Sequence, residues 1–383
     1  MDETLATHPA LLPAGLRDVL PPEAEVEARC VGTIMDCFDA YGYQRVKTPL
    51  IEFEESLFAG AGAATAEQTF RLMDPSSQRM MGLRADTTPQ IARLAATRLS
   101  AAPRPLRLAY SGQCLRVRGS QLQPERQVAQ AGIELIGHDG AGADAEIIVT
   151  AAAALAAAGL PDVSFDLTVP WLVLSLMEQV EPELRPELSR ALDRKDSAAV
   201  ASFNTLYTGV FLKLLEATGA ASRAIPALLA IDLPAASKVH AIRIAETVRA
   251  STSQNPKLAL TIDPIEFRGY QYHTGICTTV FAAGRQAELG RGGRYLSGNG
   301  EPATGITLYP DTIVRVAPPP SLRPRLYLPF GTAPGDAETC RRQGFATIPA
   351  FNENNPPLIE AARLGCTHVY QNGQIIIVAK DKT

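Results

Sequence analysis

The stretch ERQVAQAGIELIG, residues 125–137, predicts a β-strand with two different faces. Successive side chains of a strand point to opposite sides. One face then carries mostly small or apolar residues, suited to packing under helices: Gln127, Ala129, Ala131, Ile133 and Leu135. On the other face Gly132 lies between Gln130 and Glu134, and would leave a hollow between an amide and a carboxylate. Spacing alone equally allows a solvent-facing strand with a glycine bulge.

The segments around this strand have the periodicity of a mixed fold. Apolar residues at helical spacing predict a helix at 23–41, and alternating residues predict a half-buried strand at 106–112. Residues from about 165 to 255 are mostly helical by pattern, and strands are expected again at 257–264 and 270–282. Antiparallel strands with helices between them favour the α+β class.

A proline-rich segment marks a domain boundary. APPPSLRPR, residues 317–325, has four prolines and is typical of a semi-rigid linker. We therefore expect a large domain over 1–317, with a helical insertion at about 165–255. A small α/β domain is expected over 325–383, where strand and helix patterns alternate.

Bulk composition excludes several classes of function. The net charge is −4 and no basic stripe is visible, so no nucleic-acid partner is expected. The six cysteines form no Cys-x-x-Cys pair and the five histidines are scattered, which argues against a metal site or a disulfide framework. The start lacks a signal-peptide pattern and no apolar run reaches 18 residues, so we expect a reduced, cytoplasmic protein without a membrane partner.

Several residues would suit an amino-acid ligand. Its ammonium needs carboxylates, and Glu134 and Asp86 are candidates. Its carboxylate needs a guanidinium, and its side chain needs a selective wall. The candidates for these two tasks are Arg116 and Arg268, then Tyr272 and His273.

Each of these residues also has a purely structural interpretation. Asp86 precedes a predicted helix and is a common type of N-cap. Arg116 could be a solvated charge, and Tyr272 and His273, in EFRGYQYHTG at 266–275, could form a sheet edge. The glycine-rich GRGGRY, residues 290–295, lacks the spacing of a P-loop and predicts a tight turn between strands.

The order of motifs resembles the catalytic domain of histidyl-tRNA synthetases. The resemblance covers about 11–316 outside the helical middle, and it is carried by LLPAGLRDVLPPEA, TPLIE, LRADTTPQIAR, LRVRGSQLQPERQVAQAGIELIG, FRGYQYHTGICTTVFA and GGRY. It implies a class II aminoacyl-tRNA synthetase-like fold, in which helices flank an antiparallel sheet, and a self-dimer.

Two departures from that family concern ATP. The second signature motif runs Phe-Arg-x-Glu-Arg in the family, whereas LRVRG keeps Arg116 but has Arg118 and Gly119 where the glutamate and second arginine belong. The third ends in Gly-Leu-Glu-Arg, whereas YPDT has Thr312 in place of the arginine that grips ATP. Loss of a cation that neutralises triphosphate removes transition-state stabilisation, so we expect no catalytic residues and no cofactor.

The histidine-side positions mostly match the synthetase motif. The resemblance implies that the following residues line a histidine pocket: Asp86, Thr88, Arg116, Gln130, Glu134, Arg268, Tyr272 and His273. Asp86 stands where synthetases have glutamate, and His273 where many have a second tyrosine. Both substitutions keep a polar side chain.

A chain with this pocket and without the ATP arginine resembles the regulatory subunits of ATP phosphoribosyltransferase. This resemblance implies allosteric feedback inhibition by histidine in the first step of histidine biosynthesis. It also implies that the chain activates a short-form catalytic subunit, in a hetero-octamer of four regulatory and four catalytic chains. The alternatives are a divergent histidyl-tRNA synthetase, another histidine-activating aminoacyl transferase, or a stand-alone histidine sensor.

Overall fold

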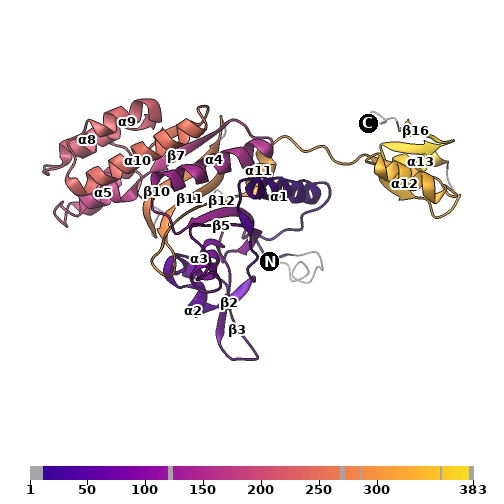
Figure 1. The fold of residues 1–383 in the computed structure, drawn as a ribbon, viewed down its shortest axis with the longest axis horizontal. Coiled ribbons are helices and arrows are strands. Elements are labelled where there is room, and N and C mark those ends of the chain that lie inside the picture. The colour runs from indigo at the N-terminus through magenta and orange to yellow at the C-terminus, as the bar shows by residue number, and fades with distance from the viewer. Residues whose placement is uncertain (1–11, 120–123, 268–271, 285–286, 354–355, 379–383) are drawn as a thin grey trace, which may run out of the picture. The chain divides into compact units, whose positions relative to one another are not determined.

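The computed structural model describes residues 12–119, 124–267, 272–284, 287–353 and 356–378. The chain divides into two compact units, Met1–Pro318 and Pro319–Thr383 (Figure 1). The predicted Arg268 lies outside the described residues. In the part of the chain that is described, no helix is both long enough and apolar enough to cross a bilayer.

A large, mostly antiparallel sheet organises the first unit. Within the described residues it has nine strands in the order β1-β5-β6-β12-β11-β10-β7-β9-β8. Neighbours from β5 through to β7 pair antiparallel, and β1–β5 and β7–β9 pair parallel. The strands are β1 Gln44–Arg45, β5 Leu106–Leu115, β6 Gln127–Ile136, β7 Val163–Thr168, β8 Gly219–Ala220, β9 Ala259–Ile262, β10 His273–Ala282, β11 Glu288–Leu296 and β12 Pro302–Leu308. This confirms the predicted α+β class.

Helices cover one face of this sheet as the alternation in β6 predicted. Ala131, Ile133 and Leu135 lie in one buried cluster with residues of α1 (Glu23–Ala40) and α4 (Ala141–Ala157). Gln130 and Glu134, on the opposite face, are also buried. The alternative of a solvent-facing strand is therefore wrong, because both faces of β6 are covered.

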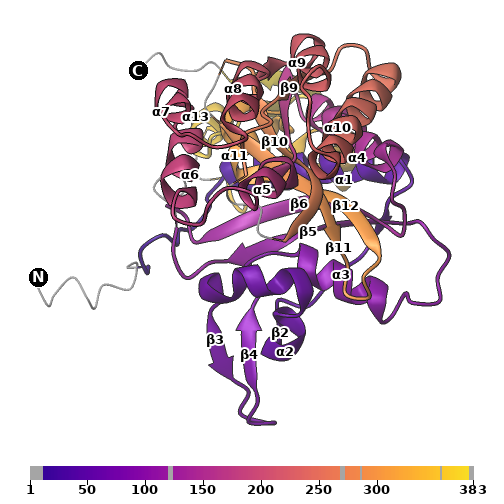
Figure 2. The ribbon, with the colours of Figure 1, turned by 90° about the vertical axis from the view of Figure 1, so that its left-hand side faces the viewer.

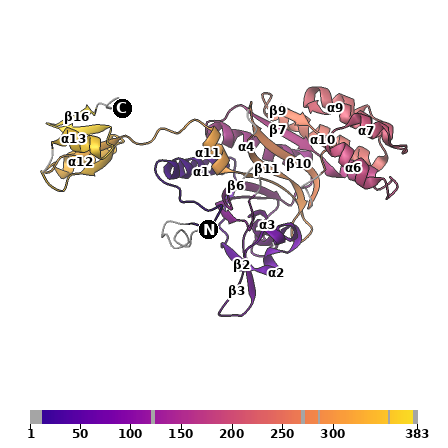
Figure 3. The ribbon, with the colours of Figure 1, turned by 180° about the vertical axis from the view of Figure 1, so that it is seen from behind.

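The expected helical segment packs beside β7, β9 and β10 (Figure 3). Its helices are α5 Pro170–Met177, α6 Arg185–Asp193, α7 Ser197–Ala201, α8 Thr208–Glu216, α9 Ala221–Leu229 and α10 Ala235–Gln254. Their apolar side chains join the same cluster as α1 and α4. Helix α11 (Pro310–Val316) follows β12 and also joins that cluster through Ile313.

A second, smaller sheet projects from the first unit on the side of α3 (Figure 2). Its order is β2-β4-β3, with β2 Ile51–Phe53, β3 Arg71–Met73 and β4 Met80–Leu83. The short helix α2 (Glu54–Leu57) and the 3₁₀ helix η2 (Gly60–Gln68) connect β2 to β3, and α3 (Thr88–Ala96) follows β4. Helix α3 contacts β6 on the face that carries Glu134.

The glycine-rich segment 290–295 is not a turn. It forms most of β11, which pairs with β10 on one side and β12 on the other. A Cβ at Gly292 would lie 2.1 Å from the Gly305 carbonyl oxygen, so the backbones are too close for a side chain there. The glycines reflect this close approach within a sheet rather than a need for turn conformations.

The second unit is a small α/β module. Its sheet has the order β14-β13-β15-β16, with apolar clusters that include α12 (Pro334–Arg342) in one and α13 (Pro357–Arg363) in the other. The strands are β13 Arg325–Leu328, β14 Ala346–Pro349, β15 His368–Gln371 and β16 Gln374–Ile377. The last two strands form a hairpin, because Asn372 and Gly373 both take positive φ and turn the chain.

Candidate functional site

Glu134 is the centre of the candidate site. Its side chain accepts hydrogen bonds from three described hydroxyls: Thr88 Oγ1 at 2.9 Å, Tyr295 at 3.0 Å and Tyr110 at 3.4 Å. These donors come from α3, β11 and β5, so three elements converge on one carboxyl group. The geometry fixes both oxygens of Glu134.

Burial controls the charge of this carboxyl group. Glu134 is 1% exposed. Burial raises its pKa to about 8, against the hydrogen bonds from Thr88 and Tyr295, which lower it. A buried carboxyl without a cationic partner favours its neutral form. A ligand that brings a positive charge would favour the ionised form.

Glycines form the floor on which the polar side chains lie. Gly305 on β12 and Gly293 on β11 continue the cross-strand row that starts at Glu134. A Cβ at Gly305 would lie 1.8 Å from Oε2 of Glu134, and one at Gly293 would lie 2.6 Å from Cδ2 of His273. Glu134 and His273 therefore fold flat over positions that only glycine can occupy.

The hollow expected over Gly132 is filled. A Cβ at Gly132 would lie 2.4 Å from the hydroxyl oxygen of Tyr110. That hydroxyl is also 2.7 Å from Thr307 Oγ1. Gly132 thus admits a tyrosine that reaches Glu134, and the open space lies elsewhere.

Two aromatic rings form the wall beside Glu134. The rings of Tyr272 and His273 stack with their centroids 4.2 Å apart, and Tyr272 meets Tyr295 edge-on at 6.1 Å. Burial, then Arg291, lowers the pKa of His273 to about 4, so its ring is neutral near neutral pH. The indole N–H of Trp171, on α5, donates to the His273 carbonyl at 3.0 Å.

These side chains enclose what we call the first hollow. It holds about 220 Å³, part of it open to solvent. Its lining is polar and aromatic, with glycines in its floor: Thr88, Glu134, Tyr272, His273, Arg291, Gly292, Gly293, Tyr295, Gly305, Ile306 and Thr307. Thr88, Glu134, Tyr272 and His273 of the predicted set are thus brought together.

Gln130 and Asp86 lie beside this group and engage each other. Gln130 Nε2 donates to Asp86 Oδ1 at 3.1 Å, while Gln130 Oε1 accepts from the backbone N–H and the hydroxyl of Thr87. Asp86 acts electrostatically on Glu134. The pair braces the start of α3, which carries Thr88, but neither residue lines the first hollow.

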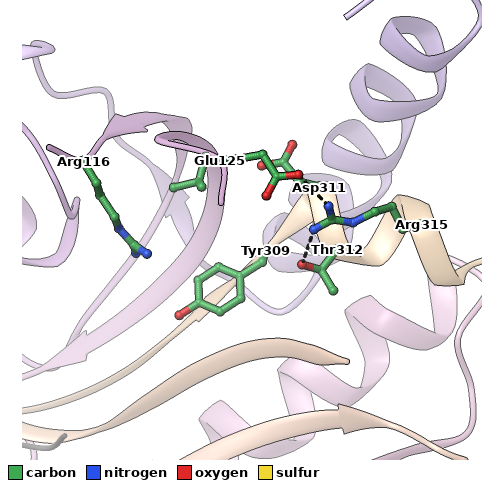
Figure 4. Close-up of a pocket in the computed structure, with 7 residues that line it drawn as sticks. Arg116, Glu125, Tyr309, Asp311, Thr312 and Arg315 are labelled. Atoms are coloured by element: carbon green, nitrogen blue, oxygen red, sulfur yellow. Dashed lines mark hydrogen bonds and ion pairs between the residues drawn. The ribbon is translucent and has the colours of Figure 1, made fainter. Parts of the chain in front are cut away.

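Arg116 lies in a different hollow from Glu134. This second hollow holds about 310 Å³, part of it open to solvent, and Figure 4 shows its charged residues. It is lined by Arg116, Glu125, Val128, Tyr309, Asp311, Thr312 and Arg315. Arg116 is therefore not brought together with Glu134 in one hollow, since β5 has ended at Leu115 and Arg116 follows it.

One arginine and one acid of the second hollow form an ion pair. Arg315 Nη1 is 2.9 Å from Glu125 Oε1, and its Nη2 donates to Thr312 Oγ1 at 3.3 Å (Figure 4). Asp311 Oδ2 accepts from the Ala129 backbone N–H at 2.7 Å. Arginine and acid are thus paired within the protein.

Sequence reasoning missed several residues of the first hollow. Tyr295, Thr307 and Arg291 line it and Tyr110 supports Glu134, and strand alternation on β5, β11 and β12 was the available signal. For Tyr295 and Arg291 that signal was lost because their segment was interpreted as a turn. Among the described residues, no group of three or more His, Cys, Asp or Glu side chains is placed to hold a metal ion.

Comparison with known proteins identifies relatives of this chain. The histidyl-tRNA synthetase family model matches residues 15–313. The ATP phosphoribosyltransferase regulatory subunit of Paramagnetospirillum magneticum is 52% identical over 95% of this chain and 97% of its own. That of Rhodospirillum centenum is 50% identical over 98% of both chains.

Solved structures show the same fold. An ATP phosphoribosyltransferase regulatory subunit/histidyl-tRNA synthetase from Bacillus halodurans matches with a TM-score of 0.78 at 25% identity, over 92% of this chain and 96% of the other. Histidyl-tRNA synthetase from Nostoc sp. PCC 7120 matches with a TM-score of 0.77 at 17% identity, over 94% and 90%. The fold is thus that of a class II synthetase core. The chain belongs to the family of ATP phosphoribosyltransferase regulatory subunits.

Proposed function

We propose that this chain is the non-catalytic regulatory subunit of ATP phosphoribosyltransferase and acts in the cytoplasm. It binds histidine in the first hollow as the feedback inhibitor of the first step of histidine biosynthesis. It is also needed for activity of a short-form catalytic subunit, with which it forms a hetero-octamer of four plus four chains built on regulatory self-dimers.

The observation that carries this proposal is the buried Glu134. Hydroxyl groups hold its oxygens in place, and no lysine or arginine is recorded as its partner among the described contacts. A buried carboxylate without a cation is costly, and a ligand ammonium would offset that cost. Tyr272 and His273 supply an aromatic wall for the imidazole of histidine.

The second hollow supports the non-catalytic part of the proposal. Triphosphate binding and activation depend on free cations. Arg116 is one cation of this hollow, but Thr312 supplies none, Arg315 is engaged by Glu125, and Asp311 adds negative charge. This arrangement disfavours a polyanion.

Regulation then follows from linkage. If histidine favours one arrangement of the complex, ligands of the catalytic subunit must change histidine affinity by the same factor at equilibrium. A coupling of about 1–3 kcal/mol is typical of such systems.

Two experiments test the proposal. Calorimetry should detect histidine binding to the isolated chain. Mixing with a short-form catalytic subunit should give a larger assembly by mass and a gain in phosphoribosyltransferase activity that histidine then reduces. Histidine-dependent ATP–pyrophosphate exchange by this chain would instead establish a synthetase or transferase, and histidine binding without any complex would establish a stand-alone sensor.

A further inference from the structure

The first hollow has an acidic and a basic side chain at two places in its lining. Alternation along β11 puts Arg291, Gly293 and Tyr295 on one face, and Tyr295 marks that face because its hydroxyl donates to Glu134. Arg291 pairs across the sheet with Thr307, whose hydroxyl approaches Tyr110. Arg291 therefore points to the same side of the sheet as the acid.

The glycine floor separates these two charges. Glu134, Gly305 and Gly293 are cross-strand partners on three adjacent strands, and Arg291 precedes Gly293 by two residues. With strands about 4.8 Å apart and about 3.4 Å per residue along β11, the Cα atoms of Glu134 and Arg291 lie roughly 12 Å apart. The carboxyl group of Glu134 shortens this gap by lying over Gly305, while the guanidinium of Arg291 meets Glu288, on the side away from Gly293. A small zwitterion can lie over the glycines with one end at each charge.

In the free chain Arg291 is partly exposed and ion-paired. It pairs with Glu288 at 3.0 Å, and the two side chains are 40% and 29% exposed. Such partly exposed ion pairs contribute little to stability. His273, the other basic residue of the lining, is neutral near neutral pH. Arg291 is therefore the only cation among the described residues that line the first hollow.

Among the described residues, Arg116 is the competing candidate for the carboxylate. Burial holds the pKa of Tyr309 well above its usual value, and Arg116 and Arg291 both act against that rise. The Tyr309 side chain thus lies within electrostatic reach of both guanidinium groups. Only Arg291 lines the same hollow as Glu134, whereas Arg116 lines the second hollow.

We propose that Arg291 binds the α-carboxylate of the ligand in the first hollow and makes this site select amino acids over the corresponding amines. This rests on the proposed binding of histidine there. Two parallel hydrogen bonds from a guanidinium match a carboxylate. Glu134 then holds a positively charged group at the other end of the ligand.

The test compares histidine with histamine, which keeps the imidazole and the amine but lacks the carboxylate. By calorimetry, the intact protein should bind histidine about 10- to 100-fold more tightly, the range expected for hydrogen bonds to charged groups. Arg291→Ala should reduce the affinity for histidine to that for histamine. The affinity for histamine should stay unchanged, which also shows that the variant is folded. Arg291→Lys should retain part of the preference.

Arg315→Ala is the matched control, since Arg315 is also a partly exposed, ion-paired arginine but lines the second hollow. It should leave the preference for histidine unchanged. A preference that survives in Arg291→Ala, or one that is lost in Arg116→Ala instead, overturns the assignment while histidine binding itself stands. If the intact protein binds neither compound, the assignment and the proposed function both fail.

Discussion

The two hollows draw on the same sheet but handle charge in opposite ways. In the first, a buried acid is held by hydroxyl groups, and the one cation of its described lining is partly exposed. In the second, Glu125, Arg315 and Thr312 engage one another directly. The difference lies in the acids: the described hydrogen bonds of Glu134 come from hydroxyl groups, whereas Glu125 is paired with Arg315, so the first hollow keeps a buried acid that a cationic ligand can meet.

The largest expected effect is loss of histidine binding in Glu134→Ala. The change removes the acid that would meet the ligand ammonium, so calorimetry should show affinity reduced by about 100-fold or more. Thr88, Tyr110 and Tyr295 would also lose their shared acceptor, which should lower the melting temperature. Glu134→Gln is the control, because it keeps an acceptor of the same size but no charge. Unchanged histidine affinity in both variants would show that Glu134 takes no part in ligand recognition.

Adding a side chain to the glycine floor of the first hollow should reduce both stability and histidine affinity. A Cβ at Gly305 would meet Glu134 Oε2 at 1.8 Å and the Ile133 carbonyl oxygen at 2.7 Å. We expect Gly305→Ala to lower the free energy of unfolding by about 1–3 kcal/mol and to weaken histidine binding at least about tenfold. Denaturant titration and calorimetry measure the two effects.

The matched control for this change is Gly142→Ala. Gly142 lies in helix α4, and a Cβ there meets nothing within 4 Å. Alanine is the better helix former, so stability should rise by up to about 1 kcal/mol. Equal behaviour of the two glycine variants would contradict the role given to the floor.

The charge of Glu134 should make stability depend on pH. Its pKa is about 8 in the folded chain, against an ordinary value of 4.5. The folded state therefore holds more protons than the unfolded state between these values, and the free energy of unfolding falls as the pH rises through that window, by up to about 1.4 kcal/mol per pH unit. Denaturant titrations from pH 5 to pH 8 measure the slope. Glu134→Gln should remove this part of it, and an identical slope in the variant would contradict the assignment.

A smaller effect is expected at Trp171, the single tryptophan of the chain. Its indole donates to the His273 carbonyl, and the residue is 40% exposed. Histidine binding beside His273 should change its fluorescence emission. Trp171→Phe removes the signal and one hydrogen bond, so affinity should fall only a few-fold, about 1 kcal/mol. Emission that does not respond to saturating histidine would place the ligand away from His273.

The smallest effect is expected from a change in the second hollow. Glu125→Gln releases Arg315 from a partly exposed ion pair, which costs about 0–1 kcal/mol. Histidine affinity should stay within about twofold by calorimetry. A tenfold change would show that the two hollows do not act independently.

Sequence periodicity was sufficient to predict many of the helices and strands. The helix at α1, the alternation of β6 and the small α/β module followed from spacing, because one face of each element is apolar. The strand β11 did not follow, since a high density of glycine normally indicates a turn. Its glycines are required by backbones from β10 and β12, which are remote in sequence.

The sequence indicated only part of the candidate site, again because residues remote in sequence build it. Motif order identified Glu134, Thr88, Tyr272 and His273, but it could not separate two neighbouring hollows, so Arg116 was grouped with them. The hydroxyl groups on Glu134 come from residues 24, 46 and 161 positions away in the sequence. Such contacts depend on strand register, which local patterns do not specify.

The rear of β11 has a consequence for how mutations act. Arg294 and Asp144 form a buried ion pair 2.9 Å apart, and Arg294 also donates to the His138 and Gly140 carbonyls. This anchors to α4 the strand whose front carries Arg291 and Tyr295. Substitution of Arg294 should therefore weaken ligand binding on the opposite face of β11, which Arg294 does not line. A mutational scan would then identify Arg294 as functionally important although it contacts no ligand.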